Sequence, residues 1–203
     1  MKKILTLILG AVILAVSFSV GVSAATKTHE VVPGDTMWRI AVKYQVGLSE
    51  LAAVNPHIKN PALIYPGDII TIPSIDSNVA AYEAEVVRLV NEERVKNGLK
   101  PLIQDWELSR VARYKSQDMK DRKYFSHTSP TYGSPFQMMK SFGIKYKTAG
   151  ENIARGYATP SAVVKGWMNS SGHRANILNK SFTHIGVGYV ESGSYWTQMF
   201  ISK

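Results

Sequence analysis

The sequence predicts an α+β protein with two folded parts, a small βααβ domain followed by a three-layer α/β/α sandwich. Residues 29–73 read as strand, helix, helix and strand, separated by turns rich in proline and glycine. Residues 80–203 start with amphipathic helices and end in two strands of alternating apolar residues. Of the 203 residues, 45% are hydrophobic and 19% charged, which is typical of folded domains and excludes a disordered chain.

Residues 1–25 have the organisation of a secretory signal peptide. Two lysines precede an uncharged apolar stretch from Ile4 to Val20, and Val22-Ser23-Ala24 forms a small-residue cleavage pattern. An uncleaved membrane anchor is the alternative, because the apolar stretch is nearly long enough to span a bilayer. The chain contains no cysteine, which excludes both a lipid-modified cysteine and any disulfide.

Positive charge is concentrated in the C-terminal part of the chain. The formal net charge is +9, and removal of residues 1–24 leaves 22 basic and 15 acidic side chains. Residues 29–73 carry three basic and four acidic side chains, whereas residues 80–203 carry eighteen and ten. We therefore expect a salt-sensitive attraction to anionic wall polymers or lipid headgroups. Nucleic acid is not expected as a partner, because the chain is exported and has no recognised nucleic-acid motif.

The first folded part begins with a predicted strand at 29–32 and a turn at 33–35. A helix follows, because four apolar side chains share the spacing of one helical face: Met37, Ile40, Ala41 and Tyr44. Asp35 or Thr36 is the predicted cap of this helix. Trp38 is predicted to lie in the core.

A second short helix and a return strand complete this domain. Gly47 ends the first helix, and Ser49 is the predicted cap of the second, which stops before Pro56. The return strand covers residues 69–72, and a polar linker covers residues 74–79.

The segments His29–Trp38, Asn55-Pro56 and Ile64–Asp68 together resemble the LysM family, at that family's spacing. The resemblance implies binding of an N-acetylglucosamine-containing glycan, here peptidoglycan. Carried over from the family, the glycan groove is lined by Gly34, Asp35, Thr36 and Met37 on one side and by Ile58, Leu63 and Ile64 on the other. The first three residues also fit a purely structural role as a turn and a helix cap.

The second folded part is predicted to hold four helices and a terminal hairpin. The helices run from about Tyr82 to Asn97, from Asp105 to Arg122, and onward from the cap sequences Ser134-Pro135 and Thr159-Pro160. The strands are predicted at residues 185–190 and 195–201.

Four segments in this part carry a second resemblance. They are Tyr124–Pro130, Gly150–Ala154, Gly166–Leu178 and Phe182–Tyr189. Together they resemble the CAP superfamily of secreted proteins, in its cysteine-free bacterial form, over about residues 80–202. The resemblance implies a surface cavity where two histidines and two glutamates can hold a divalent cation.

Transferred to this sequence, His127 is the first histidine, Glu151 the first acid and His184 the second histidine. Ser170 stands where many relatives have the second glutamate, and His173 is an additional candidate for the cleft. The resemblance thus implies a metal site of His127, Glu151 and His184 for a divalent cation such as zinc. The alternative is structural, with these side chains fixing turns and neighbouring loops.

The first functional hypothesis is a secreted, wall-associated protein that binds peptidoglycan and presents the His/Glu cleft to an unidentified ligand. A hydrolase dependent on metal or on a His/Glu pair, acting on cell wall or protein, is the second. The sequence contains neither a nucleophile elbow nor a His-Glu-x-x-His helix, the motifs that would support a hydrolase. The third is a spore coat or cortex assembly protein, which the timing of expression would distinguish from the first.

Overall fold

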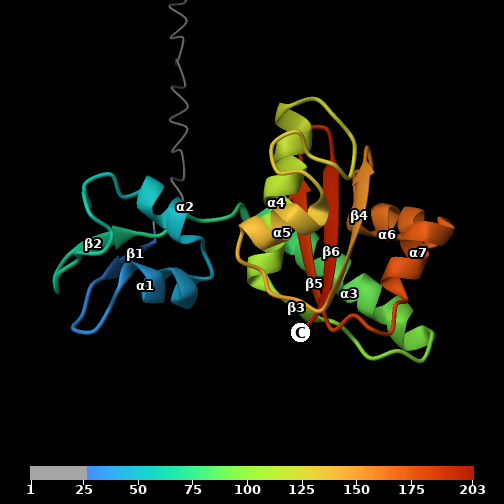
Figure 1. The fold of residues 1–203 in the computed structure, drawn as a ribbon, viewed down its shortest axis with the longest axis horizontal. Coiled ribbons are helices and arrows are strands. Elements are labelled where there is room, and N and C mark those ends of the chain that lie inside the picture. Colours follow the sequence, from blue (N-terminus) through green and yellow to red (C-terminus); the bar gives the residue numbers. More distant parts are fainter. Residues whose placement is uncertain (1–26) are drawn as a thin grey trace, which may run out of the picture.

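The structure is a computed structural model that describes residues 27–203. The predicted signal segment at residues 1–25 lies outside this range. Within residues 27–203, no helix combines the length and the apolar character needed to cross a membrane. Figure 1 shows a smaller N-terminal domain joined to a larger C-terminal domain.

The N-terminal domain is a two-stranded antiparallel sheet covered by two helices. Its elements are β1 (Thr28–Glu30), α1 (Met37–Tyr44), α2 (Leu48–Ala53) and β2 (Ile69–Thr71). Its core consists of seven buried side chains: Val31, Met37, Ile40, Ala41, Leu51, Ile70 and Ile72. This is the βααβ arrangement that the sequence predicts.

Three local predictions in this domain are wrong. Helix α1 ends at Tyr44, with Gln45 as its left-handed cap, and Gly47 instead precedes α2. The side chain of Trp38 is 62% exposed, because α1 buries Met37, Ile40 and Ala41, and the next residue after Met37 points away from that face. Ser49 does not cap α2, which begins at Leu48 without a side-chain cap. At α1 the cap is Thr36, whose side chain accepts a hydrogen bond of 3.1 Å from the Arg39 amide.

The C-terminal domain has a four-stranded sheet between two helical layers, which confirms the predicted sandwich (Figure 1). Its elements are α3 (Ser77–Lys96), β3 (Ile103–Gln104), α4 (Trp106–Asp121), α5 (Pro135–Ser141), β4 (Thr148–Arg155), α6 (Pro160–Asn169), α7 (Ser171–Ile177), β5 (His184–Val190) and β6 (Tyr195–Ser202). The strand order is β3-β5-β6-β4, antiparallel except for β3 with β5. Helices α3, α6 and α7 pack on one face, and α4 and α5 on the other.

Three elements were not expected from the sequence: β3, β4 and α7. Helix α3 also begins at Ser77, so the last residues of the predicted linker at 74–79 are helical. Asp76 caps this helix by accepting hydrogen bonds from the Asn78 and Val79 amides.

Helix α4 lies directly on β5 because two glycines leave room for its backbone. A Cβ atom at Gly186 would come within 2.3 Å of the Leu108 carbonyl carbon, and one at Gly188 within 2.1 Å of the Arg113 amide nitrogen. The alternate residues Ile185, Val187 and Tyr189 face the other layer. The two central positions of β5 that face α4 are therefore constrained to be glycine.

The two domains contact each other through an ion pair. Arg110 on α4 donates hydrogen bonds to both carboxylate oxygens of Glu50 on α2, one of them 2.9 Å long, and another of 3.0 Å to Ser49. Its guanidinium also stacks on the rings of Tyr114 and Phe142, at 5.4 and 5.2 Å from their centroids. Burial alone would raise the pKa of Glu50, but the hydrogen bonds from Arg110 and Ser49 lower it to about 2.

We expect Gly188→Ala to destabilise the C-terminal domain by about 3 kcal/mol, because the added methyl group forces α4 away from the sheet. Urea unfolding measures this change. Gly172→Ala is the matched control, since open space surrounds Gly172 in the first turn of α7 and its φ is not positive. If the free energy of unfolding of Gly188→Ala lies within about 0.5 kcal/mol of the parent value, the packing argument is contradicted.

Candidate functional site

Helix α4 holds the loop that carries His127. The Lys115 side chain is 1% exposed, and its ammonium group donates hydrogen bonds of 2.7 Å to the Ser126 carbonyl and 2.8 Å to the His127 carbonyl. Asp118 accepts hydrogen bonds from three hydroxyl groups of the same loop: Tyr124 (2.6 Å), Ser129 (2.7 Å) and Thr131 (2.6 Å). A buried cation thus holds the middle of the loop, and the adjacent carboxylate holds residues on either side of it.

His127 contacts Glu151 on β4. Its Nδ1 atom lies 2.7 Å from Glu151 Oε1, the His127 side chain is 53% exposed, and that of Glu151 is 1% exposed. This contact orients the imidazole and leaves its Nε2 atom free to meet a ligand. The other carboxylate oxygen, Oε2, is buried and has no hydrogen-bond partner within residues 27–203.

Burial raises the pKa of Glu151 above its usual range, although the hydrogen bond to His127 and the nearby Lys115 ammonium act in the opposite direction. Burial lowers the pKa of His173, and the positive charge of His127 contributes to the same shift. The site therefore combines a carboxyl group with a raised pKa and an imidazole with a lowered pKa, both shifted mainly by burial.

The residues on either side of Glu151 explain the Gly-Glu-Asn sequence. A Cβ atom at Gly150 would lie 2.9 Å from the Phe182 ring, so no side chain fits there. Asn152 donates hydrogen bonds to the His173 carbonyl (3.1 Å) and to Gln198 Oε1 (2.9 Å). Asn176 on α7 donates to the Glu151 carbonyl (3.1 Å) and to Asn152 Oδ1 (2.8 Å). This amide network fixes α7, and His173 with it, against β4.

A cleft of about 500 Å³ opens beside this pair. Polar side chains that line it are Ser126, His127, Arg155, Ser170 and His173, and the aromatic ones are Phe125, Tyr157 and Trp167. The Trp167 indole donates a hydrogen bond of 3.2 Å to the Ile153 carbonyl. The Tyr157 ring lies against Gly166, where an added Cβ atom would come within 2.6 Å of the Tyr157 hydroxyl oxygen. Rigid aromatic walls around imidazoles suit a ligand with both apolar and polar groups.

His184 lies outside this cleft. It starts β5, its Nδ1 atom is 2.7 Å from the Thr183 hydroxyl, and its pKa is lowered by burial and by Lys203. Within residues 27–203 no group of three or more His, Asp or Glu side chains is arranged to hold a metal ion. In the structure, His184 does not line the cleft that His127 lines, and the second imidazole of that cleft is His173.

The residues of the predicted glycan groove differ in what they can offer a ligand. Leu63 is 57% exposed, Ile58 and Ile64 pack against the core, and the side chain of Met37 is buried. The Asp35 carboxylate accepts hydrogen bonds from the Val32 amide (3.0 Å) and from His29 (2.8 Å), and the Thr36 hydroxyl caps α1. Gly34, with a φ of +90°, forms the turn. Of the predicted groove residues, Gly34, Thr36 and Leu63 are exposed, Asp35, Ile58 and Ile64 are half-buried, and Met37 is buried.

Sequence reasoning did not identify Lys115 or Asp118. The available signal was the position of Lys115 on the apolar face of its helix, in register with Leu108, Val111, Ala112 and Met119. A lysine at such a position needs buried partners. The aromatic walls at Phe125 and Tyr157 carried no comparable signal.

We expect Glu151→Gln to stabilise the protein at about pH 8 and to have a smaller effect at about pH 4. Because burial raises the folded-state pKa of Glu151 above its unfolded value, stability falls as pH rises from the unfolded value through the raised one, and glutamine resembles the protonated form. Urea unfolding midpoints of the parent and the variant, measured across this pH range, test whether their difference in stability changes with pH. Glu191→Gln, at an exposed position, is the control and should follow the parent at every pH. A stability difference that does not vary with pH would contradict the assignment.

Comparison with known proteins gives two family matches. Residues 29–73 match the LysM domain, and residues 87–201 match the cysteine-rich secretory protein family, CAP. A curated relative is "Uncharacterized protein YkwD" of Bacillus subtilis, 63% identical over 155 residues, which cover 76% of this chain and 60% of that protein. The chain thus spans less than two thirds of the length of this relative.

Two further similarities concern parts of the chain. A crystal structure of an extracellular protein containing a SCP domain from Bacillus anthracis matches with a TM-score of 0.60 and 34% identity, covering 68% of this chain and 47% of that one. The spore coat assembly protein ExsA of Bacillus cereus is 48% identical over 48 residues, which are 24% of this chain and 8% of that protein. On its sequence match and its fold, this chain belongs to the cysteine-rich secretory protein (CAP) family and carries a LysM domain before its CAP domain.

Proposed function

We propose that this protein is exported to the bacterial cell wall, where its LysM domain binds peptidoglycan and its CAP domain presents the His127 cleft to a ligand. The single observation that carries the proposal is the combination of a LysM domain with an open, preformed cleft in one chain. Attachment to the wall raises the concentration of the cleft near its ligand. The extracellular relative from Bacillus anthracis supports the same location.

The ion pair of Arg110 with Glu50 supports a joint action of the two domains. The pKa of Glu50 is lowered to about 2, so both partners of this pair carry their charges at neutral pH. The LysM domain then carries the cleft in a defined orientation to the glycan.

We expect Leu63→Asp to weaken binding to chitin oligosaccharides at least tenfold, which corresponds to about 1.4 kcal/mol. The side chain is exposed, so its replacement removes an apolar wall of the glycan groove without disturbing the core. Isothermal titration of residues 27–203 measures the affinity. Val42→Asp is the control, because it introduces the same charge at an exposed position on α1. An equal loss of affinity in the two variants would contradict the assignment of Leu63 to the glycan groove.

The contact between His127 and Glu151 favours a second candidate function, acid–base hydrolysis in the same cleft. Under the binding function, we expect residues 27–203 to release no soluble fragments from purified peptidoglycan, as followed by mass spectrometry. Release that falls at least about a hundredfold in both His127→Ala and Glu151→Gln would overturn that expectation and establish the hydrolase.

A role in the spore envelope is a narrower form of the first proposal. Its support is the similarity to the spore coat assembly protein ExsA, which extends over 48 residues. Peptidoglycan is the glycan in both the vegetative wall and the spore cortex, so the binding chemistry proposed for LysM is the same in either place.

A further inference from the structure

A second hollow lies at the opposite end of α4 from the His127 cleft. It has a volume of about 510 Å³ and is lined by the start of α4, the segment that follows α5, and the end of the chain. Residues 122–131 near the cleft follow the last turn of α4, whereas Asp105 and Glu107 at the hollow stand at its first turn. Lys115, which holds the His127 loop, stands ten residues after Asp105, so its position is roughly 15 Å further along the helix axis.

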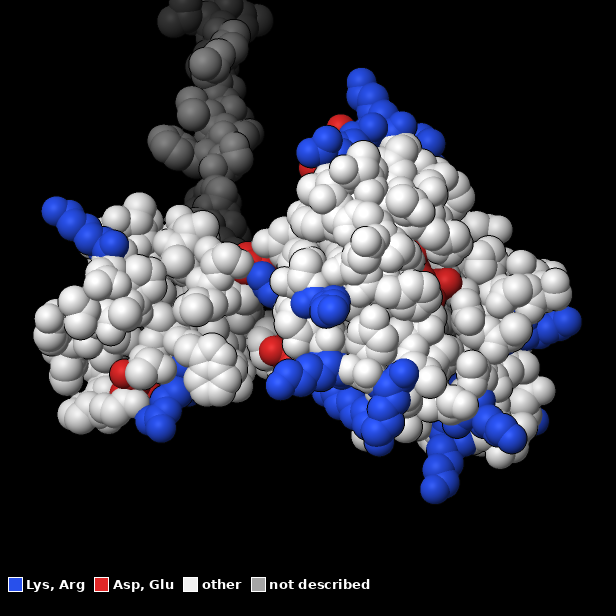
Figure 2. Space-filling view, in the orientation of Figure 1, with Lys and Arg blue, Asp and Glu red and all other residues white. Residues whose placement is uncertain are grey.

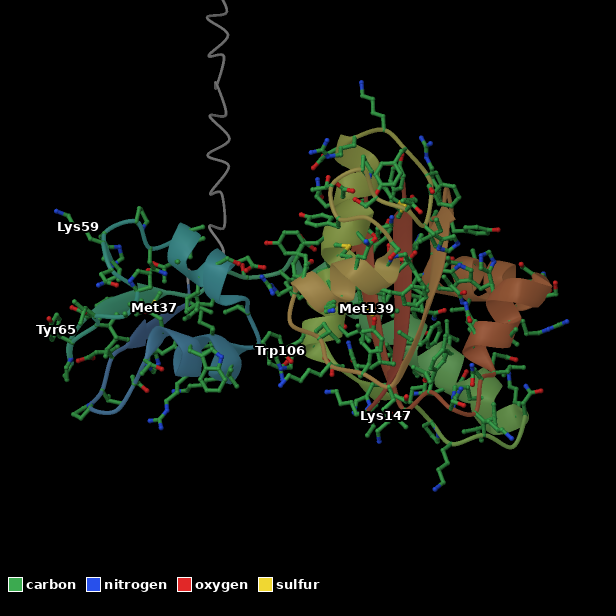
Figure 3. The ribbon with its side chains drawn as sticks, in the orientation of Figure 1. Met37, Lys59, Tyr65, Trp106, Met139 and Lys147 are labelled. Carbon is green, nitrogen blue, oxygen red and sulfur yellow. The ribbon has the colours of Figure 1, made fainter. Side chains whose placement is uncertain are left out.

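Three lysines surround this hollow, which we term the lysine hollow: Lys145, Lys147 and Lys203. In the segment after α5, Ile144 and Tyr146 pack against the core, and the two lysines that alternate with them are exposed. Lys203 comes from the segment after β6, which adjoins the first segment through a hydrogen bond of 2.9 Å from the Lys147 amide to the Ser202 carbonyl. Figure 3 shows Lys147 at the lower end of the CAP domain, where Figure 2 shows basic side chains gathered.

The charges of this hollow are not balanced internally. Lys203 is paired with Asp105 at 2.6 Å, and Asp105 also caps α4 by accepting a hydrogen bond from the Leu108 amide. Lys145 and Lys147 form no ion pair within residues 27–203, and Glu107 is the remaining acid of the lining. The Lys147 ammonium group donates one long hydrogen bond of 3.4 Å to the Lys203 main-chain oxygen, so neither Lys145 nor Lys147 has its charge neutralised by an acidic side chain of the hollow.

We propose that the lysine hollow binds a linear phosphodiester polymer, such as a polyol phosphate chain of the cell wall, with Lys145 and Lys147 contacting its phosphates. Ammonium groups bind phosphate as point charges, and successive phosphates on one strand can meet successive lysines. The concave shape favours a single extended chain over a membrane, because a flat lipid surface cannot reach the floor formed by Ile144 and Tyr146. This site is independent of the glycan groove and of the His127 cleft.

The test measures binding of residues 27–203 to soluble poly(glycerol phosphate) at low ionic strength. Lys145→Gln combined with Lys147→Gln should weaken binding at least tenfold and reduce the slope of log affinity against log salt by about 1.4. Lys165→Gln combined with Lys180→Gln changes the net charge equally at exposed positions outside the hollow, and should change affinity less than about threefold. Glu107→Gln should strengthen binding.

Three results would overturn the proposal. The first is absence of binding by the parent protein, and the second is an equal loss in the two double variants, which would indicate attraction to net charge alone. The third is stronger, Lys145- and Lys147-dependent binding to vesicles of phosphatidylglycerol than to the polymer, which would identify a membrane as the partner. All substituted side chains are exposed, so folding is expected to be unaffected.

Discussion

The close contact between α4 and β5 is the constraint on which the CAP domain depends. Gly186 and Gly188 allow the helix backbone to rest on the strand, and this fixes where every side chain of α4 points. Lys115 and Asp118 then reach the His127 loop, Arg110 reaches the LysM domain, and the first turn borders the lysine hollow. One helix therefore connects the cleft, the hollow and the neighbouring domain.

Buried charges do in this chain what disulfides do in many secreted proteins. The chain has no cysteine, and its irregular segments are held instead by side chains that donate several hydrogen bonds. Arg94 donates to the carbonyls of Lys100 (3.0 Å), Ile177 (2.7 Å) and Asn179 (2.9 Å), and Lys115 does the same for the His127 loop. Glu83, whose pKa is raised by burial in spite of its Arg113 partner, joins α3 to α4 and to the Tyr189 amide.

The regular elements could be predicted where apolar spacing and turn residues agree, as in the βααβ unit and the terminal hairpin. Strand β4 could not, because Gly150, Glu151 and Asn152 are weak strand formers whose identities are set by the site. Which of His173 and His184 lies beside His127 could also not be decided without the pairing register of the sheet. Glu151 lies opposite Met199 on β6, whereas His184 lies opposite Ile201 of the same strand, on its far side.

Strand β4 is the edge of the sheet, and such edges invite pairing with a second chain. Two of its carbonyls, those of Glu151 and Ile153, are already occupied by the side chains of Asn176 and Trp167. The contacts that shape the cleft thus also obstruct strand addition at the centre of this edge. Under the proposed attachment to the wall, the protein would be at high local density, where this arrangement would oppose assembly into intermolecular sheets.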